Sequence, residues 1–94
     1  SRLPFTAPRN TYITRDKKWV SISGSAQSTF ERMCEALDIK SLIFDNRFLD
    51  NRLRIKNAKA LDDELQKAIS KFDQLTLIIL KKFFKNNISN HEKI

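Results

Sequence analysis

The apolar residues of this chain change their spacing around its single glycine, Gly24. Before Gly24, in "KWVSIS", Val20 and Ile22 alternate with Ser21, which is typical of a strand with one face toward a core. After Gly24, apolar residues return at the spacing of one helix face, namely Phe30, Met33, Cys34 and Leu37. The chain therefore predicts a strand followed directly by a helix, with a small-residue turn between them.

A hairpin is expected to precede this helix. The short runs "TYIT" and "KWVSIS" are separated by "RDKK", a pattern that predicts two antiparallel strands. In the second strand, Trp19, Ser21 and Ser23 should face one side, and Val20 and Ile22 the other. The preceding residues, 1–10, contain both prolines and predict an extended, linker-like segment.

Three helices are expected after the hairpin. Ser28 and Glu31 form a capping-box pattern, which places the first helix start near Ser28. The second should run over 58–72 after Asn57 as N-cap, and the third over 74–86 after Asp73. The second helix has an apolar face consisting of Leu61, Leu65, Ala68, Ile69 and Phe72.

The remaining segments are predicted to be less regular. Residues 37–57 should form an irregular segment with single turns, anchored by Leu42, Ile43, Phe44 and Phe48. The third helix is apolar nearly all round, so we expect another surface to cover it. Residues 88–94 should fray. The predicted fold class is α+β, a short antiparallel β-hairpin followed by three helices, in one domain over 1–94.

Composition narrows the range of functions. The 94 residues carry a net charge of +7, which favours anionic partners. The basic residues are spread along the chain, however, and no predicted helix has a basic face, so nucleic acid is disfavoured. No apolar run approaches the ~20 residues that span a bilayer. One cysteine excludes an intramolecular disulfide and suits a reducing cytoplasm, where we expect the protein to be located.

The residue types available exclude several kinds of site. His91 and Cys34 are single, so the sequence offers no zinc-type ligand set, and we expect no metal. Ser23 and Ser25 have no histidine nearby to activate them. The turn around Gly24 could cradle a phosphate or simply cap a helix, and one glycine without a following lysine favours the cap.

Two stretches together resemble a known family. The stretch "PRNTYITRDKKWVSISGSAQSTFERMCEALD", followed by "FDNRFLDNRLRIKNAKALDDEL", is similar to the smaller domain of the family III CoA-transferases, the CaiB/BaiF family that includes formyl-CoA transferase. The first stretch matches at Pro8, Arg9, Asn10, Tyr12, Thr14, Asp16, Trp19, Val20, Phe30, Glu31, Arg32 and Cys34. The second matches at Asp45, Arg47, Phe48, Asn51, Arg54, Asn57 and Leu61. Lys17 replaces a hairpin glycine of the family, and Asn46 replaces a proline.

The resemblance implies an enzyme that moves CoA from an acyl-CoA to a carboxylic acid through an aspartyl anhydride, with no permanently bound cofactor. The family's nucleophilic aspartate belongs to a large domain outside this chain, so we expect no catalytic residue here. It also implies that this domain partners the large domain, that the complete enzyme is a homodimer, and that the active site lies between large and small domains.

The same resemblance suggests which residues face substrate. Ser23, Gly24, Ser25 and Gln27 are expected to line the acyl-CoA cleft, and Arg2 and Arg9 are candidates for an anion contact. Related racemases have a glutamate near the position of Gln27, and a glutamine cannot shuttle a proton, so the racemase branch is disfavoured. The alternative is a basic nucleic-acid or protein-interaction module.

Overall fold

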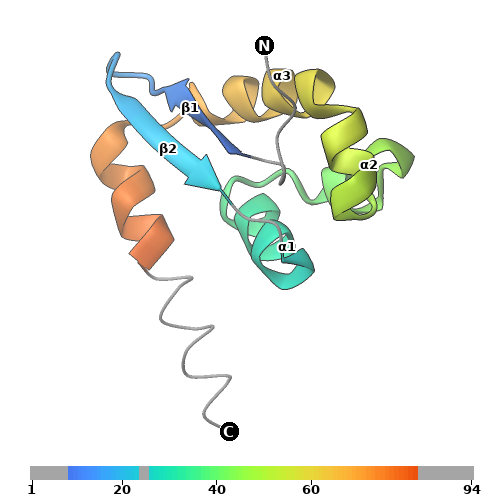
Figure 1. Ribbon diagram of the computed structural model, residues 1–94. Helices are drawn as coiled ribbons and strands as arrows, with labels where there is room; N and C mark the ends of the chain where they lie inside the picture. Colours follow the sequence, from blue (N-terminus) through green and yellow to red (C-terminus); the bar gives the residue numbers. More distant parts are fainter. Residues whose placement is uncertain (1–8, 24–25, 83–94) are drawn as a thin grey trace, which may run out of the picture.

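The computed structural model describes residues 9–23 and 26–82. A two-stranded antiparallel hairpin precedes a series of helices (Figure 1), which confirms the predicted α+β class. The elements in chain order are β1 (Arg9–Ile13), β2 (Trp19–Ser23), α1 (Gln27–Ala36), the 3-10 helices η1 (Lys40–Phe44) and η2 (Asn46–Phe48), α2 (Asn51–Lys56) and α3 (Ala58–Ile69). A further helix occupies 74–82.

The hairpin loop closes on a residue in the left-handed region. The backbone N–H of Lys17 donates to the Thr14 carbonyl at 3.0 Å, and Lys17 has a φ of 64°. Lys17 is the last residue of the turn over 14–17, and a left-handed residue at this place is typical of a common three-residue hairpin loop, where it is often glycine. Lys17 therefore has a backbone conformation that is more usual for glycine.

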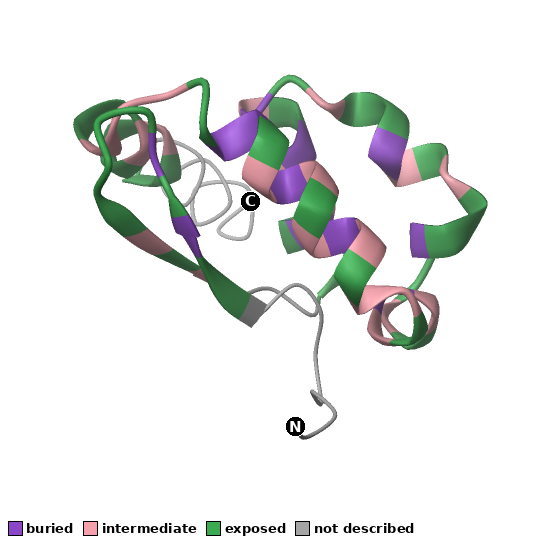
Figure 2. Cartoon of the chain, turned by 90° about the horizontal axis from the view of Figure 1, so that it is seen from above, coloured by how far each residue is buried: buried purple, intermediate pink, exposed green. Residues whose placement is uncertain are grey.

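The core lies between the hairpin, α1 and α3 (Figure 1), and buried residues occur on each of these elements (Figure 2). Phe30 and Cys34 of α1 are fully buried, and Met33 packs against the same cluster, which confirms the predicted apolar stripe. Val20 and Ile22 also pack against the core, whereas Trp19 is 61% exposed, as the strand alternation predicted. The predicted buried face of the second helix is confirmed: Leu61, Leu65, Ala68 and Ile69 are buried, and Phe72 packs against them.

Side chains of α3 bind the hairpin. The Gln66 amide donates to the Ile13 carbonyl at 2.8 Å and accepts from the Ile13 backbone N–H at 3.0 Å. One turn earlier, Asp62 accepts from the Tyr12 hydroxyl at 2.6 Å and from the Asn10 amide at 3.0 Å. Burial and this carboxylate raise the pKa of Tyr12, so its hydroxyl stays protonated and donates.

Two predicted helix caps are wrong, although both helices begin where the sequence predicted. The capping box at Ser28 and Glu31 is wrong, because α1 begins at Gln27 and its N-cap residue, Ala26, makes no side-chain cap. Asn57 does precede α3, but its side chain does not cap that helix. Its amide donates instead to the Arg47 and Leu53 carbonyls.

The segment 37–57 is more regular than predicted, since it contains η1, η2 and α2. Leu42 and Phe48 are buried as expected, but Phe44 is 78% exposed, so its predicted role as an anchor is wrong. A 3-10 helix has three residues per turn, so Phe44, two residues after Leu42, lies on a different side of η1.

The helix over 74–82 begins against the hairpin loop. Asp73 accepts from the Thr76 N–H at 2.8 Å, which confirms Asp73 as its cap, and Asp16 accepts from the Gln74 N–H at 3.1 Å. The Arg15 N–H also donates to the Phe72 carbonyl at 2.7 Å. Large apolar side chains of this helix are exposed, namely Leu75, Ile78 and Ile79.

Candidate functional site

The candidate site is the turn that joins β2 to α1. Ser23 ends β2, where its backbone pairs with that of Arg9, and Gln27 begins α1. Gly24 and Ser25 lie between them and outside the described residues, as does Arg2. Among the six predicted substrate-contacting residues, Gln27 is the one with side-chain hydrogen bonds in the described part of the chain.

Gln27 is exposed, yet both ends of its amide are bound by the protein. Its Nε2 donates to Glu31 Oε2 at 3.0 Å, one helical turn further along α1. Its Oε1 accepts from Arg54 Nη1, also at 3.0 Å. Arg54 is 27 positions away in sequence and belongs to α2. The first residue of α1 is thus attached to a distant helix by a charged hydrogen bond.

Arg54 is fully buried, which is unusual for a charged side chain. Its Nη1 also donates to the Phe48 carbonyl at 3.1 Å, and its guanidinium carbon lies 4.3 Å from the centroid of the Phe30 ring. Burial lowers the pKa of Arg54, but a guanidinium remains charged in proteins. Asp50 opposes this lowering with its negative charge. A buried cation with these partners holds η2, α1 and α2 together.

Cys34 lies on the α1 face that packs near Arg54. Burial raises the pKa of the Cys34 thiol to about 12, although the nearby Arg54 charge acts in the opposite direction. At neutral pH the side chain is a protonated, buried thiol, which agrees with its place on the predicted apolar face of the first helix.

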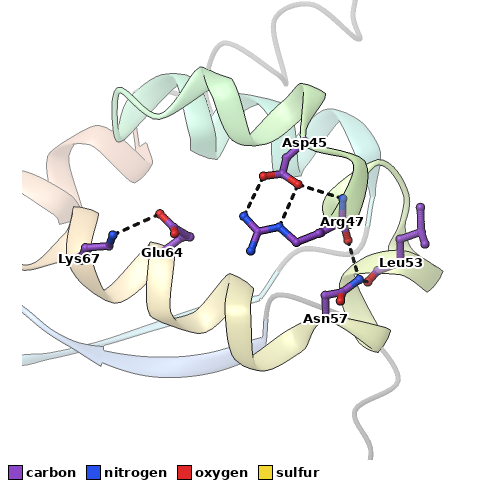
Figure 3. Close-up of polar contacts among 6 residues, drawn as sticks. All are labelled: Asp45, Arg47, Leu53, Asn57, Glu64 and Lys67. Atoms are coloured by element: carbon purple, nitrogen blue, oxygen red, sulfur yellow. Dashed lines mark hydrogen bonds and ion pairs between the residues drawn. The ribbon is translucent and has the colours of Figure 1, made fainter.

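A polar network connects η2 with α2, the short helix that carries Arg54 (Figure 3). Asp45 accepts from the Arg47 backbone N–H at 2.9 Å and from the Arg47 Nη2 at 2.8 Å. The Asn57 amide donates to the Arg47 carbonyl at 3.2 Å and to the Leu53 carbonyl at 3.0 Å. Asp50 caps α2 by accepting from the Leu53 N–H at 2.8 Å. The second matching stretch of the sequence therefore builds the support for Arg54.

Arg54 is a residue of the site that the sequence patterns did not predict. Its only sequence signal is its spacing in "NRLRIKN", where Asn51, Arg54 and Asn57 recur every three residues. In isolation, an arginine in such a basic stretch indicates a solvated surface. Its contact with Gln27 shows that the two stretches that resemble the family are parts of one structural unit.

Metal-binding groups and membrane-spanning helices are two further features that the sequence analysis considered. Within residues 9–23 and 26–82, no group of three or more His, Cys, Asp or Glu side chains could hold a metal ion. Among the helices of these residues, none is both long and apolar enough to cross a membrane.

Comparison with known proteins identifies the family. Residues 1–84 match the family described as CoA-transferase family III, and the chain belongs to this family. It is 34% identical over 71 residues to the acetyl-CoA:oxalate CoA-transferase of Acetobacter aceti. The aligned segment covers 76% of this chain and 18% of that protein. It is 36% identical over 61 residues to the succinyl-CoA–D-citramalate CoA-transferase of Chloroflexus aurantiacus, which covers 65% of this chain and 15% of that protein. The chain spans less than a fifth of the length of these curated relatives.

Proposed function

We propose that this chain is the small domain of a CoA-transferase that moves CoA from an acyl-CoA to a carboxylic acid. The observation that carries the proposal is the family match over residues 1–84. Both relatives named above are CoA-transferases, which supports the transferase branch over the racemase branch and over a nucleic-acid-binding module. Gln27 in place of a proton-transferring glutamate supports the same choice.

The proposed reaction starts at an aspartate outside this chain. Its carboxylate attacks the thioester carbonyl of the acyl-CoA. The carbon–sulfur bond breaks, CoA thiolate departs, and an acyl-aspartyl anhydride forms. The thiolate then attacks the aspartyl carbonyl, which releases the first carboxylic acid and forms an enzyme–CoA thioester. The acceptor carboxylate attacks this thioester, which releases CoA thiolate and forms a second anhydride. The thiolate attacks the acceptor's carbonyl in that anhydride, which forms the new acyl-CoA and frees the aspartate carboxylate. Acyl-CoA is a substrate here, and no step uses a bound cofactor.

In this proposal the small domain shapes the cleft and supplies no nucleophile. Ser23, Gly24, Ser25 and Gln27 line the acyl-CoA cleft, and Arg2 and Arg9 contact a phosphate or carboxylate. The fixed, exposed amide of Gln27 supports this role, because polar groups held in one orientation can position a substrate. The chain alone would be inactive.

The proposed partners are a large domain of the same enzyme and a second copy of the complete enzyme, in the cytoplasm. The exposed apolar residues Leu75, Ile78 and Ile79 support cover by another protein surface, as does the exposed Trp19. In this arrangement, residues 1–94 form one domain. The predicted linker over 1–10 overlaps β1 at Arg9 and Asn10, and the rest of it, like residues 88–94, lies outside the described residues.

The proposal is tested with the complete polypeptide that includes this chain. Purified enzyme is incubated with acetyl-CoA and oxalate, or with succinyl-CoA and D-citramalate, and CoA esters are separated by chromatography. We expect the acceptor's CoA ester to form, and the 94-residue chain alone to form none. Hydrolysis of the donor without a new ester, in a panel of dicarboxylic acids, would contradict a transferase.

The anhydride route has its own test. After incubation with acyl-CoA alone, mass spectrometry of the denatured enzyme should show covalently attached CoA that hydroxylamine removes. Sequencing of the labelled peptide should place the attachment outside residues 1–94. Label found within these residues would contradict the assignment of the nucleophile to another domain.

A further inference from the structure

The partners of Gln27 determine which way round its amide points. Arg54 carries only hydrogen-bond donors, so the atom 3.0 Å from its Nη1 must be the Gln27 carbonyl oxygen. An ionised Glu31 offers only acceptors, so the atom 3.0 Å from Glu31 Oε2 must be the Gln27 nitrogen. The two contacts agree, and the reversed amide would bring donors against donors and acceptors against acceptors.

In this orientation one amide N–H of Gln27 remains available to a ligand, beside the second lone pair of its carbonyl oxygen. The amide nitrogen has two hydrogens, and Glu31 accepts from one. Among residues 9–23 and 26–82, none accepts from the other. Gln27 is exposed, so this second N–H can donate to an incoming ligand, while its carbonyl faces the buried Arg54.

We propose that Arg54 is a positioning residue that fixes the Gln27 amide so that it presents an N–H donor to an acceptor oxygen of the substrate. The ligand chemistry is a carbonyl or carboxylate oxygen, both of which occur in an acyl-CoA and its acceptor acid. This inference rests on the proposed function, because it takes the substrate class from it.

A lysine could not replace the guanidinium in this position. The planar guanidinium lies over the Phe30 ring while Nη1 reaches both Gln27 and the Phe48 carbonyl. A lysine ammonium has a charge but not this flat, forked geometry. The conservative variant Arg54→Lys therefore tests geometry separately from charge.

The test measures kcat and KM of the complete enzyme for Gln27→Ala, Gln27→Glu, Arg54→Met and the double variant Gln27→Ala with Arg54→Met. We expect Gln27→Ala and Arg54→Met each to lower kcat/KM by about tenfold. The double variant should be no worse than the worse single variant, because Arg54 would act through Gln27. Gln27→Glu, which cannot donate when ionised, should lose more activity than Gln27→Ala.

Gln66→Leu is the matched control. Gln66 binds both backbone polar groups of Ile13 and contacts neither Gln27 nor Arg54. Its loss should lower the unfolding temperature and leave kcat/KM within about twofold of the parent enzyme. Where Arg54→Met fails to fold, the same double-variant comparison is made with Arg54→Lys.

The outcomes separate the inference from the proposed function. A double variant whose loss is the product of the two single losses would overturn the positioning role and leave the transferase intact. Full activity of Gln27→Glu would overturn the donor role, and full activity of Gln27→Ala would overturn the whole inference. A parent enzyme that transfers no CoA between any donor and acceptor would overturn the proposed function, and the inference with it.

Discussion

Gln66 binds Ile13 through both of that residue's backbone polar groups, so the α3 side chain occupies the free edge of β1 as a neighbouring strand would. The Ile13 N–H donates to Gln66 Oε1 at 3.0 Å, and Gln66 Nε2 donates to the Ile13 carbonyl at 2.8 Å. A two-stranded hairpin is barely stable in water by itself, so packing and hydrogen bonds from α3 matter to its stability.

Replacing Gln66 with leucine should therefore destabilise the chain. The substitution removes both hydrogen bonds to Ile13, and we expect a loss of about 2 kcal/mol in the free energy of unfolding. Urea unfolding of the 94-residue chain, followed by circular dichroism, measures this loss. Lys67→Ala is the control on the same helix, because its 3.8 Å ion pair is exposed and should contribute less than about 0.5 kcal/mol. Equal stability of the two variants would contradict this role of Gln66.

Lys17→Gly should stabilise the hairpin. Lys17 has a φ of 64°, where a side chain costs about 1–2 kcal/mol, and part of this gain is lost to the greater freedom of glycine in the unfolded chain. We expect a net gain of about 0.5 kcal/mol by thermal unfolding. Lys18→Gly, at a neighbouring position without positive φ, should instead lower stability. A loss of stability in both variants would show that the lysine at position 17 is not strained.

Asp45 should make stability sensitive to acid. Hydrogen bonds from the Arg47 side chain and backbone lower the pKa of Asp45 to about 2. A carboxyl with a lower pKa in the folded state contributes stability above its unfolded pKa of ~3.9, and this contribution is lost as pH falls toward 2. The stability advantage of the parent chain over Asp45→Asn should accordingly shrink between pH 4 and pH 2, measured by urea unfolding at each pH.

The arginine partner supplies the control for this pH effect. In an Arg47→Met background, the pH dependence of the Asp45→Asn difference should be smaller, because the side-chain hydrogen bonds at 2.8 and 3.0 Å are gone. An unchanged pH profile would show that the Arg47 side chain is not what lowers the pKa of Asp45.

Cys34 should be unreactive while the chain is folded. Its side chain is fully buried and the pKa of its thiol is raised to about 12, so thiolate is scarce and inaccessible at neutral pH. A chromogenic disulfide reagent should react slowly with the native chain and rapidly in concentrated urea. An exposed cysteine introduced by Ser21→Cys should react rapidly without urea. Fast native labelling of Cys34 itself would contradict its burial.

Local sequence patterns predicted much of the fold. The alternation in β2 and the helical stripes of α1 and α3 predicted which side chains face the core, because strand and helix periods are properties of the backbone alone. Capping was less predictable. Asp73 caps its helix, but Asn57 and Ser28 do not, since each side chain has several nearby backbone groups to choose from.

Part of the candidate site also follows from the sequence, and part follows from the tertiary structure alone. The sequence by itself determined the hairpin, the helix that follows it and the resemblance that pointed to Gln27. Only the tertiary structure decided that Phe44 faces solvent and that Arg54 is buried beneath Gln27. The reason is physical: burial of a charged arginine depends on partners distant in sequence, here Phe30, Phe48 and Gln27, and no local period encodes their meeting.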